Sequence, residues 1–206
     1  SLWMAGGNVL PPSPYDLKTG EYLGERDLGE GTPRSNRGEE IAVFRDDILL
    51  TGGRLRYSAP DNIISPGIFT LERDGATQQL CRGRIVPAWD DDLLAFIPGR
   101  SQTPSAFTAD GVDKLLDTNR AVLGLAGRAW SADSLAGSDV EAMAMASDVV
   151  AVACSSPLYR MLESRWRVVL LDRESGRMLA EHELPGQVKM NGLAIDREGR
   201  LLVALR

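Results

Sequence analysis

The chain has 206 residues, of which 43% are hydrophobic, and it carries a formal charge of −6 with a pI near 4.9. This balance argues against a nucleic-acid partner, because phosphate binding needs a concentrated basic surface and here Lys and Arg are interspersed with acids. No apolar run approaches the roughly 18 residues needed to span a bilayer, and no signal peptide is visible in Ser1-Leu2-Trp3-Met4.

In chain order, the sequence repeats one pattern: an apolar strand, a tight turn rich in Asp or Gly, and a second apolar strand. The 21 glycines and 11 prolines recur at short intervals, and this spacing favours many short strands and an all-β fold. The intervals between equivalent positions are 45, 56 and 52 residues, about the length of a four-stranded propeller blade. The four predicted hairpins are residues 41–50, 85–96, 142–152 and 193–203.

Between these hairpins lies a second recurring element, a strand that ends in a turn of Asp and Gly and is followed by further apolar residues. Its copies are residues 15–23, 69–75, 107–111 and 169–179. Two hairpins per repeat predict four-stranded antiparallel blades, with the 41–50 type of hairpin forming inner strands and the second element forming outer ones.

Two of these turns carry a family resemblance. Tyr15-Asp16-x-x-Thr19-Gly20 and Leu171-Asp172-x-x-Ser175-Gly176 resemble the Asp-x-x-Thr-Gly turn of pyrroloquinoline-quinone-like (PQQ-like) propeller repeats. The resemblance implies a bacterial, extracytoplasmic (periplasmic) quinoprotein-like β-propeller, comparable with other short-repeat propellers of the WD40 and YVTN kind. In that family a tryptophan commonly follows the glycine by about four residues and docks neighbouring blades, whereas Gly24 and Ala180 hold those places here.

The repeat predicts one partial propeller domain with about four blades. The blade limits that it suggests are residues 1–58, 59–104, 105–158 and 159–206. The sequence stops directly after an inner strand, so we expect a larger ring whose other blades belong to the same protein. A helix content close to zero follows from this architecture.

Acidic pairs in the hairpins could suggest acid–base catalysis or a cation site. Asp46-Asp47 and Asp90-Asp91-Asp92 occupy the same turn position as Asp148 and Asp196, so a turn role is the better interpretation. His182 is the only histidine, and its place between Glu181 and Glu183 favours a surface or blade-edge position over a triad or a metal centre.

Asn191-Gly192 before the fourth hairpin also resembles the blade start of calcium-dependent, gluconolactonase-type hydrolases. In those enzymes such an asparagine is a calcium ligand, so Asn191 is a candidate metal residue under that alternative alone. A plain strand-entry turn is the preferred interpretation, and the chain has no adjacent cysteine pair of the kind that quinone-binding enzymes use.

The remaining candidates concern packing and partners. Trp130 and Trp166 lie in or beside the longer connections 124–138 and 155–165, where a propeller face would bind a partner. Cys81 and Cys154 fall in different repeats, so we expect them not to be bonded to each other and each to be a free buried thiol.

The leading hypothesis is therefore a binding scaffold that takes a protein or small-molecule ligand on a propeller face, with no catalytic residue and no required cofactor. The alternative is an enzyme, either a quinoprotein dehydrogenase with PQQ or a lactonase with calcium. Fold alone does not decide between them.

Overall fold

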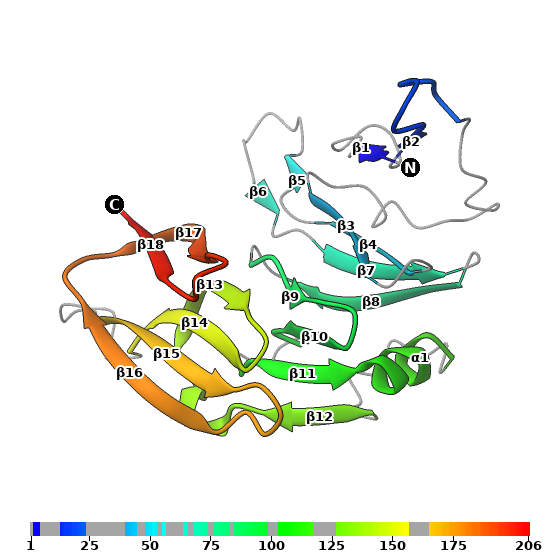
Figure 1. Ribbon diagram of the computed structural model, residues 1–206. Coiled ribbons are helices and arrows are strands. Elements are labelled where there is room, and N and C mark those ends of the chain that lie inside the picture. Colours follow the sequence, from blue (N-terminus) through cyan, green and yellow to red (C-terminus); the bar gives the residue numbers. More distant parts are fainter. Residues whose placement is uncertain are drawn as a thin grey trace. The chain divides into compact units, whose positions relative to one another are not determined.

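A computed structural model describes residues 2–4, 13–23, 40–44, 48–52, 55–56, 64–65, 68–73, 76–82, 85–98, 103–117, 127–156 and 165–206. The chain divides into two compact units (Figure 1). The first contains Ser1–Arg84 and Leu115–Leu123, and the second contains Ile85–Lys114 and Gly124–Arg206. Asp46 and Asp47 lie outside the described residues.

Among its described residues, the first unit has one four-stranded antiparallel sheet, in the order β3-β4-β7-β8, and two two-stranded sheets, β1-β2 and β5-β6. Their strands are β1 (Leu2–Met4), β2 (Ser13–Tyr15), β3 (Glu40–Phe44), β4 (Ile48–Gly52), β5 (Leu55–Arg56), β6 (Ile64–Ser65), β7 (Ile68–Arg73) and β8 (Ala76–Arg82).

The described part of the second unit has two four-stranded antiparallel sheets, β12-β11-β10-β9 and β13-β14-β15-β16, and the two-stranded sheet β17-β18. Their strands are β9 (Ala88–Trp89), β10 (Leu93–Phe96), β11 (Ser105–Thr108), β12 (Arg128–Ser131), β13 (Asp139–Met145), β14 (Val149–Ser155), β15 (Trp166–Asp172), β16 (Met178–Leu184), β17 (Val188–Ile195) and β18 (Leu201–Leu205). A 3-10 turn, Asp133–Leu135, follows β12.

The central strand β14 of the β13–β16 sheet is buried on both faces. Val150 and Val152 of β14 belong to a core cluster that includes Leu93 and Ala106 of the β9–β12 sheet. Ala151, which alternates with them, belongs to a second cluster with residues of β17. Successive side chains of a strand point to opposite faces, so a run of small and β-branched residues in β14 suits a sheet packed between two others. The three sheets of this unit therefore pack face to face in chain order.

The four predicted hairpins are confirmed. They form β3-β4, β9-β10, β13-β14 and β17-β18, and each lies in a different sheet. The described chain is accordingly all-β apart from its helical segments, with sheets of up to four antiparallel strands.

The sheets do not follow the predicted blade limits. Each four-stranded sheet begins with the repeat hairpin and continues with the element that comes after it, so the sheets span 40–82, 88–131 and 139–184. The limits at 58/59, 104/105 and 158/159 each cut a sheet between its second and third strands. The predicted limits place the second element in one blade with the hairpin that follows it, whereas β15 pairs with β14 of the preceding hairpin from Val149↔Asp172 to Ser155↔Trp166.

The expected turn at residues 107–111 is wrong. β11 ends at Thr108, and the nine-residue helix α1 (Ala109–Asp117) follows at once. The Thr108 hydroxyl accepts a hydrogen bond from the Gly111 amide at 3.2 Å, and Asp110 lies in the first turn, which are both features of a helix start. Val112, Leu115 and Leu116 are buried at helical spacing, so side-chain burial prevails over the turn signal of Asp-Gly.

The strand β16 is an edge of its sheet and carries polar residues accordingly. His182 is exposed on it between Glu181 and Glu183, which confirms the predicted edge position. Charged residues on an edge strand discourage pairing with other chains. No helix in the described part of the chain has the length and apolar character needed to cross a membrane.

Candidate functional site

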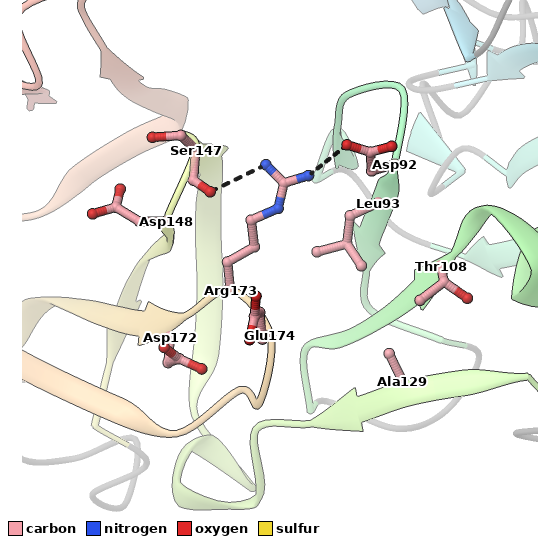
Figure 2. Close-up of a pocket in the computed structure, with 9 residues that line it drawn as sticks. All are labelled: Asp92, Leu93, Thr108, Ala129, Ser147, Asp148, Asp172, Arg173 and Glu174. Atoms are coloured by element: carbon pink, nitrogen blue, oxygen red, sulfur yellow. Dashed lines mark hydrogen bonds and ion pairs between the residues drawn. The ribbon is translucent and has the colours of Figure 1, made fainter.

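The second unit has a hollow of about 690 Å³ at the turns that join its strands (Figure 2). Three turns contribute to it: β9 to β10, β13 to β14 and β15 to β16. The lining residues are Asp92, Leu93, Thr108, Ala129, Ser147, Asp148, Asp172, Arg173 and Glu174.

Arg173 holds the three turns together, and Figure 2 shows its guanidinium directed between Asp92 and Ser147. Its two terminal nitrogens contact the two carboxylate oxygens of Asp90, at 2.6 and 2.8 Å. It also donates to the carbonyl oxygens of Ala146 and Ser147, at 3.3 and 3.5 Å. The Arg173 side chain is only 15% exposed, so this paired arrangement is mostly shielded from water.

The carboxylate of Asp90 has a turn role, as predicted. Its Oδ1 accepts hydrogen bonds from the amides of Asp92 and Leu93, at 3.0 and 3.1 Å. Asp196 does the same in the β17-β18 turn for Glu198 and Arg200. These bonds are the usual means by which aspartate stabilises a tight turn.

Asp172 opens the turn between β15 and β16. The hydroxyl and the amide of Ser175 both donate to its Oδ1, and these hydrogen bonds hold the pKa of Asp172 below its ordinary value of 3.8. The side chain of Arg200 lowers the pKa of Asp196 in a similar way. Both carboxylates are therefore ionised at neutral pH.

The turn of Asp172 is also the docking point for Trp130. The indole Nε1–H donates to the Arg173 carbonyl at 2.6 Å. Gly176 has a φ of +68°, and a Cβ atom added there would lie 2.5 Å from the Trp130 ring. Only glycine leaves room for the ring at this position.

The sequence predicts Trp130 as a candidate partner-binding residue, but its side chain is buried and offers little surface to a partner. It is 6% exposed, lies in β12 and belongs to the core cluster. Trp130 and Arg173 are 43 residues apart in sequence, so no local motif links the tryptophan to this turn. Trp166 is the first residue of β15 and packs, half-buried, against the second core cluster.

Asn191 has a structural role in the backbone of β17. It lies in β17 with a φ of 56°, beside an irregularity in the pairing with β18. Its Oδ1 accepts a hydrogen bond from the Val86 amide at 3.0 Å. Asparagine is one of the few residues that tolerate this backbone conformation. Within the described ranges no group of three or more His, Cys, Asp or Glu side chains is arranged to hold a metal ion.

Cys154 is a free and buried thiol, as predicted. Burial raises its pKa, although Arg167 on the neighbouring strand opposes the shift. A buried thiol with a raised pKa is a poor nucleophile. The side chain of Cys81 lies outside what the structure describes.

The chemistry that the hollow offers is electrostatic. Four of its nine lining residues are acidic, and its single guanidinium is already paired with Asp90. The carboxylates of Asp92, Asp148 and Glu174 are exposed, and its lining contains neither histidine nor cysteine. It can attract cationic groups and hydrogen-bond donors. Arg173, which organises it, was not predicted.

No protein-family model matches the chain, and no curated protein matches it. Among solved structures, a luciferin-regenerating enzyme matches with a TM-score of 0.43 and 12% sequence identity. The match covers 86% of this chain and 57% of that chain, so the present chain spans little more than half of that enzyme's length.

Proposed function

We propose that this chain forms β-propeller blades of the quinoprotein-like kind and serves as a binding scaffold, with the acidic hollow as its recognition surface. The observation that carries the proposal is the hollow itself. Three hairpin turns from two stacked sheets form it, and its exposed groups are carboxylates. Loops and turns at one end of a rigid β scaffold are the common location of binding residues.

The family assignment is supported by the turn between β15 and β16. Its Asp-x-x-Ser-Gly sequence resembles the family turn, and Trp130 from the preceding sheet docks on its glycine. Docking of neighbouring blades by tryptophan is what the resemblance implies. We further propose that the whole protein forms a closed propeller ring built of PQQ-like repeats and that it is located in the periplasm.

The charge of the hollow indicates the class of ligand. Asp92, Asp148 and Glu174 place exposed negative charge around a guanidinium that is already paired. A positively charged ligand, such as a lysine-rich segment of a protein, complements this surface. The formal net charge of the chain, −6, adds a long-range attraction for a positively charged ligand.

Titration of an oligolysine peptide against the protein tests this function. Asp148→Asn and Glu174→Gln should each weaken binding about two- to five-fold, as expected for exposed ion pairs. Asp139→Asn removes the same charge from an exposed residue outside the hollow, and it should leave binding nearly unchanged. Equal losses in all three variants would mean that only the net charge matters, and the hollow would lose its assigned role.

Absorbance spectroscopy and calcium analysis of the purified protein separate the scaffold from the two enzyme alternatives. The scaffold predicts no quinone absorbance and no stoichiometric calcium, and Asn191→Ala should leave the calcium content unchanged. A bound quinone would favour the dehydrogenase alternative. Loss of a stoichiometric calcium in Asn191→Ala would favour the lactonase alternative.

A further inference from the structure

The hollow of the second unit has two chemically different sides. Figure 2 shows Arg173 and Glu174 on one side of it, and Leu93, Thr108 and Ala129 on the other. Thr108 and Ala129 are exposed, whereas Leu93 is buried. The second side therefore offers a ligand apolar groups as well as the Thr108 hydroxyl.

The negative charge of the hollow is spread over three separate turns. Asp92 comes from the β9–β10 turn, Asp148 from the β13–β14 turn and Glu174 from the β15–β16 turn. Figure 2 shows Asp92 and Asp148 on opposite sides of the Arg173 side chain. The Asp92 carboxylate lies 3.9 Å from the guanidinium and its side chain is 91% exposed, so this contact is loose. A ligand with several separated positive charges can contact more of these carboxylates than a compact ion can.

The positive charge in the hollow is already neutralised, and this disfavours an anionic ligand. Arg173 contacts both carboxylate oxygens of Asp90, at 2.6 and 2.8 Å, and an anion would have to compete with this paired arrangement. The volume of about 690 Å³ lies within the range of about 300–1,000 Å³ that is typical of small-molecule sites. Charge and size together favour a small organic cation.

We propose that the hollow binds a linear aliphatic polyamine, in which ammonium groups are separated by short methylene chains. The ammonium groups pair with Asp92, Asp148 and Glu174, and the methylene chain lies along Thr108 and Ala129. Such a ligand complements both sides of the hollow, because it carries positive charge for the carboxylates and apolar length for the second side. This inference rests on the proposed function, since it names the class of ligand for the same recognition surface.

Calorimetric titration of the protein with spermidine, a linear trication, tests the inference. Hexaamminecobalt(III) is the charge-matched comparison, because it is a compact trication with N–H donors and no methylene chain. At equal ionic strength it should bind about ten-fold more weakly than spermidine, the difference that burial of about two methylene groups produces. Butylamine, which carries a single ammonium group, should bind more weakly by about two- to five-fold for each missing charge.

Variants separate the contributions of the two sides of the hollow. Asp148→Asn should weaken spermidine binding about two- to five-fold, because one ion pair is lost. Ala129→Leu leaves the charge unchanged and fills part of the second side, so spermidine should bind about ten-fold more weakly. Ala136→Leu, at an exposed alanine outside the hollow, is the matched control and should leave binding unchanged. Amide resonances outside the hollow that match those of the parent would establish that Ala129→Leu is folded.

The oligolysine titration distinguishes this inference from the proposed function. If oligolysine binds at the hollow and spermidine binds no more tightly than hexaamminecobalt(III), the polyamine is overturned and the recognition surface stands. If neither oligolysine nor spermidine binds, both proposals are overturned. Equal losses of spermidine binding in Ala129→Leu and Ala136→Leu would also overturn the polyamine, because its methylene chain would then not lie in the hollow.

Discussion

The indole of Trp130 lies where a side chain at Gly176 would have to be: three atoms of its ring are 2.5, 2.7 and 3.0 Å from the position that a Cβ atom would take. The same indole donates to the Arg173 carbonyl. One residue of β12 thereby fixes a turn of the neighbouring sheet, and that turn carries the guanidinium that forms the centre of the hollow.

Gly176→Ala should destabilise the protein more than the equivalent change at Gly20. Both substitutions place a side chain at positive φ, which costs about 1–2 kcal/mol. Only the change at Gly176 also displaces a buried ring, so its unfolding free energy should fall by about 1–3 kcal/mol more. Denaturant unfolding of the two variants measures the difference. Equal losses would contradict the packing of Trp130 on Gly176.

Trp130→Phe should cost about 1 kcal/mol of unfolding free energy, because the Arg173 carbonyl loses its indole donor. Trp130→Ala should cost about 3–5 kcal/mol, because it also leaves a cavity in the core cluster. Trp166→Phe, at a half-buried tryptophan of β15, is the control and should cost less than Trp130→Phe. A Trp130→Phe variant as stable as the parent would show that this hydrogen bond does not contribute to the unfolding free energy.

A double-mutant cycle tests the pairing of Arg173 with Asp90. Arg173→Met and Asp90→Asn should be coupled by about 0.5–3 kcal/mol, because the two groups contact each other through two nitrogens and two oxygens in a partly buried place. The cycle of Arg197 with Glu198 is the control, since the Arg197 side chain is 92% exposed, and its coupling should be near zero. Similar coupling energies in the two cycles would argue against a special role for Arg173.

Ser175→Ala should raise the pKa of Asp172 toward 3.8, because the hydroxyl that stabilises its carboxylate is removed. A carboxyl whose pKa is lower in the folded state stabilises the fold above the unfolded-state pKa, and this contribution is lost as pH falls through the folded-state pKa. The parent should therefore lose stability on acidification below about pH 4, and Ser175→Ala should lose less.

Carboxyl carbon resonances followed through an acid titration report this pKa directly. Ser134→Ala, at an exposed serine remote in sequence, is the control and should not move it. An unchanged pKa in Ser175→Ala would indicate that the backbone amides alone stabilise the carboxylate.

The repeat could be predicted from the sequence because each hairpin is encoded locally. Alternation of apolar residues around an Asp turn specifies β13-β14 and its three counterparts, and Asp-x-x-Ser-Gly specifies the turn at Gly176. The sheet limits could not be predicted in the same way. They depend on whether the second recurring element pairs with the hairpin before it or the hairpin after it, and those two hairpins have similar sequence patterns. In the structure β15 pairs with β14, the strand before it.

The hollow could not be predicted because its residues come from separate turns. Asp92, Ser147 and Arg173 are far apart in sequence, and no local motif marks Arg173 as the residue that joins them. The start of α1 was missed for a related reason. The signal of Asp110-Gly111 is local, whereas the burial of Val112 and Leu116 that favours the helix depends on tertiary contacts.

A crystal structure of the protein is the decisive test of the propeller scaffold. In a propeller, the sheets beginning with β3, β9, β13 and β17 should lie radially about a common axis, with these first hairpins nearest to it and the Arg173 hollow on one face. Sheets merged into a single continuous sheet, or stacked without a common axis, would contradict the propeller and with it the assignment of the hollow as its recognition surface.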